Sequence, residues 1–388
     1  MKYVDEFRNR RLIDKVAGEI RRAADPKRTY NIMEVCGTHT MSIFRFGLRS
    51  LLPENIRLIS GPGCPVCVTP NEYIDKAIAI ANMKNVIVAT FGDMLKVPGS
   101  YSSLEKEKAK TADIRIVYSS LDALDLAKKH PNKEVVFLGI GFETTAPTVA
   151  QSVIIAGKSA VENYSVLCGH KTMPEVMEAL VKDGPSAGSG PVLSKAAHGM
   201  SAASKDGSIK VDAFLLPGHV SAIIGLKPYG FLSKIYKKRC VVSGFEPLDI
   251  MQAILMIIRQ ARPEVEIQYK RIIEKNGNPL AKKSIKNVFE KCPSVWRGIG
   301  CVKNSGLKIR KSYGAFDAEL RFKPRIKKTR DNTRCFCGYI LKGLKTPYDC
   351  PSFARGCTPE NPIGACMVSS EGTCAAYYKY GKDTLKPR

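Results

Sequence analysis

The sequence predicts an α/β protein with two similar parallel-sheet domains and a mainly helical and irregular C-terminal domain. Three observations support this fold class. Short apolar runs alternate with helical patterns over roughly the first 230 residues, an order typical of parallel sheets covered by helices. From Cys240 onward, longer helical patterns replace this alternation. The end of the chain is rich in cysteine, glycine and proline and shows little periodicity.

The first predicted domain covers residues 1–130 and begins with an amphipathic helix. Strands are expected in the segments YNIMEV, IRLIS, NVIVAT and IRIVYSS, and helices in YIDKAIAIANM and LDALDLAKKH. The expected strands are short apolar runs, whereas the helical segments repeat apolar residues with helical spacing. Glycine-containing and polar loops follow the strand ends, which is where open α/β sheets bind ligands.

The same alternation restarts in the second predicted domain, residues 131–230, with strands in EVVFLG, NYSVLC and VDAFLLP. Residues 183–208 are rich in glycine, serine and alanine, a composition that predicts a flexible insertion. The third predicted domain, residues 231–388, has helices in PLDIMQAILMIIRQA and EVEIQYKRIIEKNG, then a basic stretch and the cysteine-rich tail. Because this tail has few core residues, its order requires an additional staple such as a metal.

The composition is that of a folded protein without a membrane-spanning segment. The 388 residues are 44% hydrophobic and 25% charged, close to the averages for soluble globular domains. No apolar run approaches the roughly 18 residues that a membrane-spanning helix needs. The N-terminus has no uninterrupted apolar region of the kind found in signal peptides. We therefore expect a cytoplasmic protein.

The charge is strongly positive, with 61 Lys and Arg against 36 Asp and Glu, a net charge of +25. The basic residues are spread along the chain, with short clusters at residues 237–239 and 323–330. No nucleic-acid-binding motif accompanies them. We therefore favour a generally lysine-rich composition or an acidic protein partner over nucleic acid.

Six of the thirteen cysteines lie in the last 54 residues, and in a reducing compartment such clusters indicate metal or thiol chemistry. Four of them have the spacing C-x14-C-x6-C-x16-C: Cys335, Cys350, Cys357 and Cys374. Structural zinc sites use closely spaced cysteine pairs, so this wide spacing favours a [4Fe–4S] cluster over zinc. The two remaining thiols, Cys337 and Cys366, form either a redox pair beside the cluster or buried small side chains.

A second group of sulfur donors lies near the N-terminus, in Cys36-Gly-Thr-His39 and Cys64-Pro-Val-Cys67. Both segments follow predicted strands, so both can lie on one rim of a sheet. Three thiols and an imidazole on one rim make either a soft-metal site or a thiol relay.

Other strand-end loops carry polar residues that are candidates for supporting roles. Glu143 in GIGFETTAP is either a general acid/base or a carboxylate near a helix N-terminus. His170 and His219 occupy equivalent positions in CGHKT and PGHVS. None of these loops has the spacing of a nucleotide-binding motif.

Long motifs along the chain resemble the family of the hydrogenase maturation factor HypD. They are CGTHT (36–40), GPGCPVCVTP (61–70), FGDMLKVPG (91–99), GIGFETTAP (139–147), LPGHVSAIIG (216–225), WRGIG (296–300) and the cysteine-rich tail. The similarity runs nearly from end to end, apart from residues 183–208, which look like an insertion. The resemblance implies two α/β domains and a third domain with a [4Fe–4S] cluster.

The resemblance also implies roles for the cysteines. The cluster would be held by Cys335, Cys350, Cys357 and Cys374, with Cys337 and Cys366 as an adjacent thiol/disulfide pair. Cys36 would be an iron ligand shared with the N-terminal cysteine of a small HypC-like partner. Its essential neighbours would be His39, Cys64 and Cys67.

The function implied by this resemblance is assembly of an iron centre. On the complex with the HypC-like partner, transient mononuclear iron would gain two cyanides and one carbon monoxide before delivery to a [NiFe]-hydrogenase large subunit. A HypE-like protein would donate the cyanide. Electrons are expected to pass from the cluster through Cys337 and Cys366 toward the Cys64–Cys67 pair. The alternatives are a stand-alone iron–sulfur thiol–disulfide oxidoreductase and a zinc-stapled nucleic-acid-binding protein.

Overall fold

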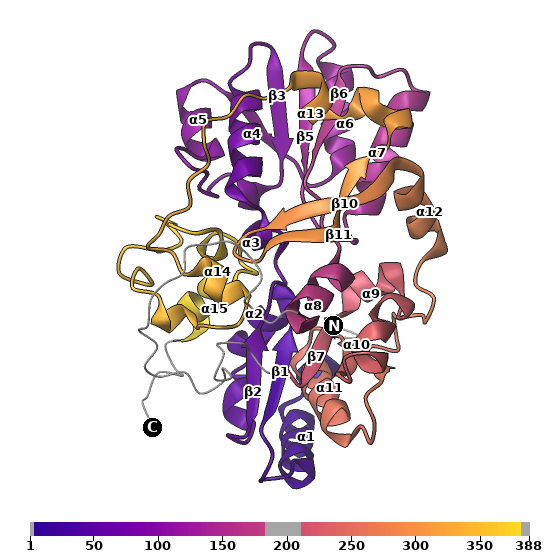
Figure 1. The fold of residues 1–388 in the computed structure, drawn as a ribbon, viewed down its shortest axis with the longest axis vertical. Helices are drawn as coiled ribbons and strands as arrows, with labels where there is room; N and C mark the ends of the chain where they lie inside the picture. The colour runs from indigo at the N-terminus through magenta and orange to yellow at the C-terminus, as the bar shows by residue number, and fades with distance from the viewer. Residues whose placement is uncertain (1–3, 183–210, 382–388) are drawn as a thin grey trace.

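The computed structural model describes residues 4–182 and 211–381. Two parallel sheets lie at opposite ends of an elongated molecule, and a cysteine-rich segment packs beside its middle (Figure 1). The predicted fold class is therefore confirmed. The predicted insertion at residues 183–208 lies outside the described residues.

Sheet A has five parallel strands in the order β2-β1-β7-β8-β9. Their bounds are β1 (Tyr30–Glu34), β2 (Ile56–Ser60), β7 (Ala213–Pro217), β8 (Arg239–Ser243) and β9 (Val265–Ile267). Side chains on one face pack with the helices α1 (Arg10–Ala23), α2 (Gly37–Arg45) and α11 (Pro247–Arg259). The helix α1 has the expected amphipathic pattern, since Ile13, Ala17 and Ile20 are its buried residues.

Sheet B has four parallel strands in the order β4-β3-β5-β6. Their bounds are β3 (Val86–Thr90), β4 (Asp113–Ile116), β5 (Glu134–Gly139) and β6 (Tyr164–Cys168). One face packs with α6 (Ser120–Lys129) and α7 (Ala146–Lys158). The other face packs with α4 (Asn71–Ala81), α5 (Leu104–Lys110) and α8 (Met173–Lys182).

A single apolar core joins the inner faces of both sheets to the C-terminal segment. It contains Phe214 and Val242 of sheet A, Val88 and Leu138 of sheet B, and the buried Trp296. Successive residues of a strand point to opposite faces, so each sheet contributes alternate side chains to this shared core and to its own outer core. The shared core places the C-terminal cysteines next to both sheets.

The sheets do not follow the predicted boundaries at residues 130 and 230. Strands β1 and β2 pair with β7, β8 and β9, whereas β3 and β4 pair with β5 and β6. The chain therefore starts in sheet A, builds all of sheet B and returns to sheet A. Local periodicity identifies a strand, but which sheet the strand joins depends on contacts with distant segments.

The region after residue 230 agrees with the expectation of helices only in part, since PLDIMQAILMIIRQA forms α11. Residues 239–243 form β8, and residues 265–267 form the edge strand β9 in place of the expected helix in EVEIQYKRIIEKNG. Gln268 N donates to Val242 O (2.9 Å), which extends the attachment of this segment to β8. After α12 (Pro279–Val288), the basic stretch forms an antiparallel hairpin of β10 (Phe289–Trp296) and β11 (Gly300–Ile309). A strand with one solvated face carries many charges. For this reason the sequence predicted only a basic stretch here and not a hairpin.

The C-terminal segment is mainly irregular, as expected. Its helices are the short α13 (Ala318–Phe322), α14 (Cys337–Leu341) and α15 (Thr373–Tyr380). Helix α15 packs against α2, and α14 packs against α3 (Pro65–Val68). In the part of the chain that the structure describes, no helix is long and apolar enough to cross a bilayer.

Candidate functional site

The two N-terminal cysteine motifs meet at the carboxyl edge of sheet A. Cys36 follows β1 and Cys64 follows β2, and these strands are adjacent and parallel. The backbones of the two loops touch, because Gly37 N donates to Gly63 O (3.0 Å). A Cβ atom at Gly63 would lie 2.3 Å from Cys36 N, so only glycine allows this close approach. The expected common rim is therefore present.

Cys36 lies beside a pair of histidines that enclose one phenylalanine. Its Sγ is 4.0 Å from His219 Nε2, at the start of α9 (Gly218–Ile224). The rings of His39 and His219 pack against Phe245, with centroids 5.2 and 5.1 Å away. His39 Nε2 lies 3.0 Å from Gly244 O. Sequence reasoning singled out both histidines but missed Phe245, which holds them together.

Burial controls the protonation of this group. Cys36 is 1% exposed, and burial raises the pKa of its thiol to about 12. Burial also lowers the pKa of His39 and of His219 to about 4. Burial in a low-dielectric interior disfavours charge. At neutral pH the site therefore presents a protonated thiol and two neutral imidazoles.

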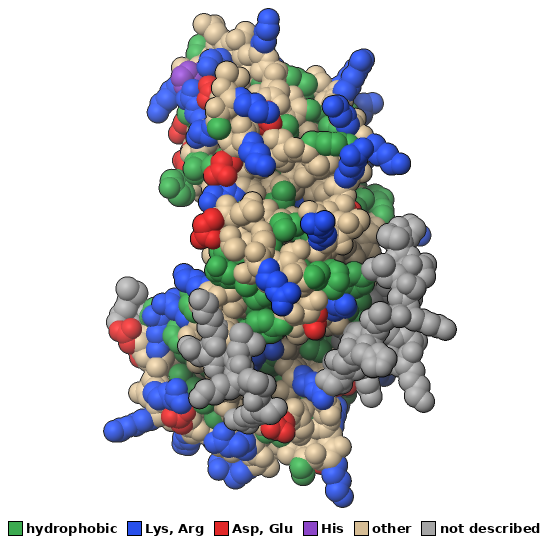
Figure 2. Space-filling model, turned by 90° about the vertical axis from the view of Figure 1, so that its left-hand side faces the viewer, with side chains coloured by type: hydrophobic (Ala, Val, Ile, Leu, Met, Phe, Trp, Pro, Cys, Tyr) green, Lys and Arg blue, Asp and Glu red, His purple; other side chains and the backbone are tan. Residues whose placement is uncertain are grey.

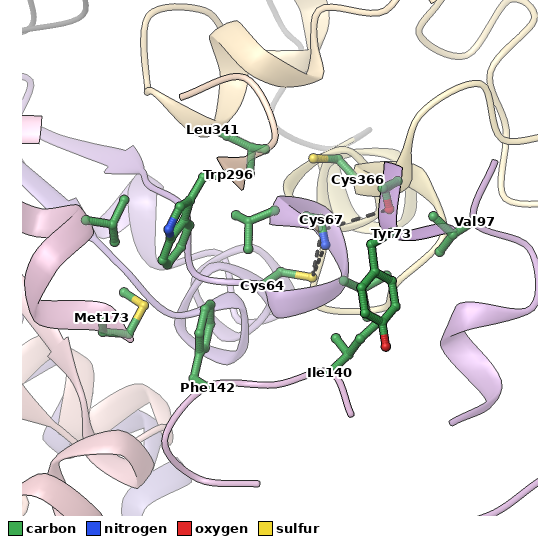
Figure 3. Packing of buried hydrophobic residues seen from close by; sticks show 14 of the residues in the cluster. Cys64, Cys67, Tyr73, Val97, Ile140, Phe142, Met173, Trp296, Leu341 and Cys366 are labelled. Carbon is green, nitrogen blue, oxygen red and sulfur yellow. Dashed lines mark hydrogen bonds between the residues drawn. The ribbon is translucent and has the colours of Figure 1, made fainter. Parts of the chain in front are cut away.

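The Cys64–Cys67 pair begins the short helix α3. Cys64 is the residue before the helix, and its Sγ accepts from Cys67 N (3.3 Å). The Cys67 thiol donates to Cys64 Sγ at 2.7 Å, so the two sulfurs are in contact (Figure 3). Cys67 is fully buried, and burial raises the pKa of its thiol. This buried dithiol lies within the core shared by both sheets.

The C-terminal segment brings a second dithiol against the first. Cys337 and Cys366 have their Sγ atoms 2.6 Å apart, and both are buried. The Cys366 side chain interacts with Cys67, and Cys67 Sγ also donates weakly to Ala365 O (3.9 Å). In Figure 3, Cys366 lies beside the Cys64–Cys67 pair. The two dithiols, which are far apart in the sequence, thus lie next to each other as a row of two thiol pairs.

All six C-terminal cysteines line one narrow cavity of about 10 Å³, which is partly open to solvent. Among them, Cys335 and Cys350 are half-buried and the others are buried. A Cβ atom at Gly364 would lie 2.4 Å from Cys335 Sγ, so glycine keeps space open beside this sulfur. Soft sulfur donors around a cavity are the environment that iron–sulfur clusters use.

Within the described ranges, no three His, Cys, Asp or Glu side chains converge as ligands of a single metal ion. Cys36, His39, Cys64 and Cys67 share a rim but do not form such a site by themselves. The C-terminal cysteines line a shared cavity, and thiolates of this kind are ligands that zinc and iron–sulfur clusters both use.

A loop of the C-terminal segment covers Cys36. Thr38 Oγ1 donates to Glu371 Oε1 (2.6 Å), and a Cβ atom at Gly37 would lie 2.5 Å from the Glu371 side chain and carbonyl. Ser369 Oγ donates to Asp93 Oδ2 (2.8 Å), in the loop after β3. Sequence reasoning missed Glu371, although its position three residues before Cys374 was an available signal.

The other candidate side chains lie in structural contacts. Glu143 is buried, and its Oε1 accepts from Met173 N (3.0 Å) at the start of α8. It thus acts on a helix N-terminus, one of its two expected roles. His170 is buried beneath sheet B, with Nδ1 3.5 Å from Cys168 Sγ, away from Cys36.

The Glu143→Gln variant is expected to reduce the pH dependence of stability. Burial raises the pKa of Glu143 from 4.5 to about 8 in the folded protein. The unfolded chain releases this proton at lower pH than the folded chain does, so the free energy of unfolding falls as pH rises between these values. At pH 7 this loss is about 3 kcal/mol. The unfolding midpoints of the variant and the wild type should be equal near pH 4.5, and the midpoint of the variant should be the higher one at pH 8. If the unfolding midpoints of the two proteins changed in parallel with pH, the raised pKa of Glu143 would be contradicted.

Comparison with known proteins gives a consistent result over nearly the whole chain. The HypD family profile, described as "Hydrogenase formation hypA family", matches residues 11–381. The chain is 46% identical over 387 residues to hydrogenase maturation factor HypD2 of Bradyrhizobium diazoefficiens, covering 98% of this chain and 97% of that protein. It is 47% identical over 388 residues to HypD of Cupriavidus necator and 42% identical over 391 residues to HypD of Escherichia coli. Each alignment covers 98% of both chains.

Proposed function

The chain belongs to the HypD family of hydrogenase maturation factors, and on this premise we propose that it forms an iron-assembly scaffold with a HypC-like partner. On this scaffold a single iron atom acquires two cyanides and one carbon monoxide. A HypE-like protein supplies the cyanide, and the finished group passes to a hydrogenase large subunit in the cytoplasm. The observation that carries the proposal is the row of thiols between the rim at Cys36 and the six-cysteine cavity.

Cys36 is the proposed iron ligand on this chain. A thiolate is a soft donor that suits iron carrying cyanide and carbon monoxide. Because burial raises the pKa of Cys36 to about 12, iron binding must displace the thiol proton. The thiol lies in the region covered by Glu371, so loading also requires the loop at residues 369–372 to move. The partner's cysteine would complete the iron site from outside.

The C-terminal cysteines are the proposed holders of a [4Fe–4S] cluster, with Cys335, Cys350, Cys357 and Cys374 as ligands. When bound, such a cluster supplies electrons at low potential. Cys337 and Cys366, which line the same cavity and have their sulfurs 2.6 Å apart, are the proposed redox dithiol, and Cys366 interacts with Cys67.

We infer direct exchange between the two dithiols, which the interaction of Cys366 with Cys67 supports. Starting from a Cys64–Cys67 disulfide, the Cys366 thiolate attacks the Cys67 sulfur, and the Cys64–Cys67 bond breaks as a Cys67–Cys366 bond forms. Attack by Cys337 on Cys366 then releases Cys67. Two electrons and two protons move to the rim pair, and Cys337 and Cys366 become the disulfide.

The test combines the chain with a HypC-like partner under anaerobic conditions. The wild-type complex should show infrared bands of iron-bound cyanide and carbon monoxide. The double variant Cys337→Ser with Cys366→Ser should retain its iron and acid-labile sulfide but lose most of these bands, because the exchange step is blocked. The control is Cys301→Ser, which replaces an exposed cysteine of β11 outside the cavity.

Three outcomes would contradict the proposal. Undiminished bands in the double variant would exclude the dithiol relay. Absence of the bands in the wild-type complex, together with bound iron and sulfide, would favour the stand-alone thiol–disulfide oxidoreductase. Absence of iron and sulfide from an ordered protein would remove both.

A further inference from the structure

The connection between α13 and α14 carries dense positive charge. Residues 321–345 contain nine Lys and Arg and a single acidic residue, Asp331. We call residues 323–334 the basic strap. All six of its basic side chains are exposed: Lys323, Arg325, Lys327, Lys328, Arg330 and Arg334. None of them forms an ion pair with a carboxylate among the described residues. Their charge is therefore available to a partner.

The basic strap is held in a defined position although it has no helix or strand. Tyr101 Oη donates to Lys328 O (2.8 Å), and Arg330 N donates to Ser100 Oγ (2.8 Å). Asn71 Nδ2 donates to Arg330 O (2.8 Å). Pro324 and Ile326 are half-buried between the exposed basic residues. The strap thus faces the protein with its apolar side chains and solvent with its charges.

The strap ends at the solvent-facing edge of the cysteine cavity. Arg334 O accepts from Ser352 Oγ (3.2 Å) and, weakly, from Cys350 Sγ (3.8 Å). The next residue, Cys335, and Cys350 itself are the half-buried cysteines of the cavity. The inner side of the cavity, at Cys366, meets Cys67. Basic charge and partial exposure therefore coincide on the side away from the rim dithiol.

Figure 2 shows the face that includes the left-hand side of Figure 1, where the strap runs from α13 to the cysteine-rich segment. Lys and Arg side chains are spread over this face and predominate over Asp and Glu. Such a surface attracts acidic proteins and accelerates their association.

We propose that the basic strap docks a small acidic one-electron carrier protein and presents its reduced centre to the cysteine cavity at Cys335 and Cys350. This inference rests on the proposed function, because it requires an electron-accepting cluster in that cavity. In each transfer the carrier loses one electron and the group held by the cysteines gains one. Two such transfers, with two protons from solvent, supply one reduction of a disulfide in the dithiol row.

Nucleic acid is the other class of partner that positive charge can bind. Single-stranded nucleic acid uses aromatic rings as stacking platforms. The ring of Tyr101 beside the strap is instead in contact with two basic side chains. Lys327 Nζ lies 5.8 Å and Arg330 Cζ lies 5.3 Å from the ring centroid. The strap also ends at the cavity edge. An electron carrier bound there would lie next to the cavity, whereas this position offers no advantage for binding a nucleic acid. The charge therefore favours a carrier protein.

The test uses the full chain, purified anaerobically with its cluster, and a photoreduced acidic ferredoxin as the probe. The triple variant Arg325→Glu, Lys327→Glu and Lys328→Glu should slow cluster reduction by the ferredoxin about tenfold or more at low salt. Reduction by dithionite, which needs no docking, should be unchanged. Calorimetric binding of oxidised ferredoxin should weaken in parallel. The control reverses three exposed lysines elsewhere, Lys283, Lys286 and Lys303, with the same change in charge.

Equal ferredoxin rates and affinities in the wild type and the strap variant would overturn the proposal. Loss of duplex-DNA binding in the strap variant, with ferredoxin binding unchanged, would also overturn it and assign the strap to nucleic acid. A wild-type chain that contains no iron and sulfide would contradict the proposed function. The calorimetric comparison would still show whether the strap binds the ferredoxin.

Discussion

The Cys36→Ala variant, purified anaerobically with a HypC-like partner, is expected to lose the infrared bands of iron-bound cyanide and carbon monoxide completely. The thiol of Cys36 follows β1, and its Sγ lies 4.0 Å from the ring nitrogen Nε2 of His219. The Cys64 and Cys67 sulfurs contact each other. Because Cys36 is the proposed iron ligand on this chain, removing its sulfur would leave the iron without that soft donor.

The same preparation distinguishes loss of the ligand from misfolding. The variant should retain the iron and acid-labile sulfide of the C-terminal cavity, because Cys36 does not line it. The matched control is Cys168→Ser. This cysteine lies at the end of β6 and donates to Leu307 O (3.0 Å), an interaction that serine can keep. Bands of wild-type intensity in Cys36→Ala would contradict the assignment of Cys36 as the iron ligand on this chain.

The second large effect is expected for Cys350→Ala, which should lose most of its bound iron and acid-labile sulfide. Cys350 is half-buried, so the change removes little packing and acts mainly through the lost thiolate. Helices α14 and α15 have five and eight residues, and residues between them are largely irregular. Since cysteines make up much of the interior of this segment, loss of the cluster should also loosen it.

Hydrogen exchange measures this loosening directly. Protection of backbone amides in α14 and α15 should fall in Cys350→Ala while protection in sheets A and B remains. The control Cys292→Ala replaces a half-buried cysteine of β10 that does not line the cavity. Full iron and sulfide content in Cys350→Ala would exclude Cys350 as a cluster ligand.

The position of the rim site could be predicted because it depends on local rules. Apolar runs ending in CGTHT and GPGCPVC predicted two strands followed by turns. Strands β1 and β2 are adjacent and parallel, so Cys36 and Cys64 reach the same sheet edge. The glycines at 37 and 63 are required where the backbones approach closely. Residue type and short-range periodicity carry this information within a few positions of the sequence.

Other features could not be predicted from local patterns. The alternation of strands and helices was read correctly over most of residues 30–182, but the boundary at residue 130 did not separate the sheets. Strand β9 resembled a helix because it is short and followed by apolar residues at helical spacing. The β10–β11 hairpin resembled a basic loop because one of its faces is solvated. In each case, pairing with a distant strand decided the outcome.

By itself, the sequence determined which donor groups this protein carries: soft sulfur donors in two groups, in loops and at the starts of short helices. Only the tertiary structure decided that Cys366 meets Cys67, that Glu371 covers Cys36, and that the basic strap ends at the cavity. The first two of these contacts join segments about 300 residues apart in the chain. Their free energy comes from burial in the shared core, and no local pattern specifies which distant surfaces will pack together.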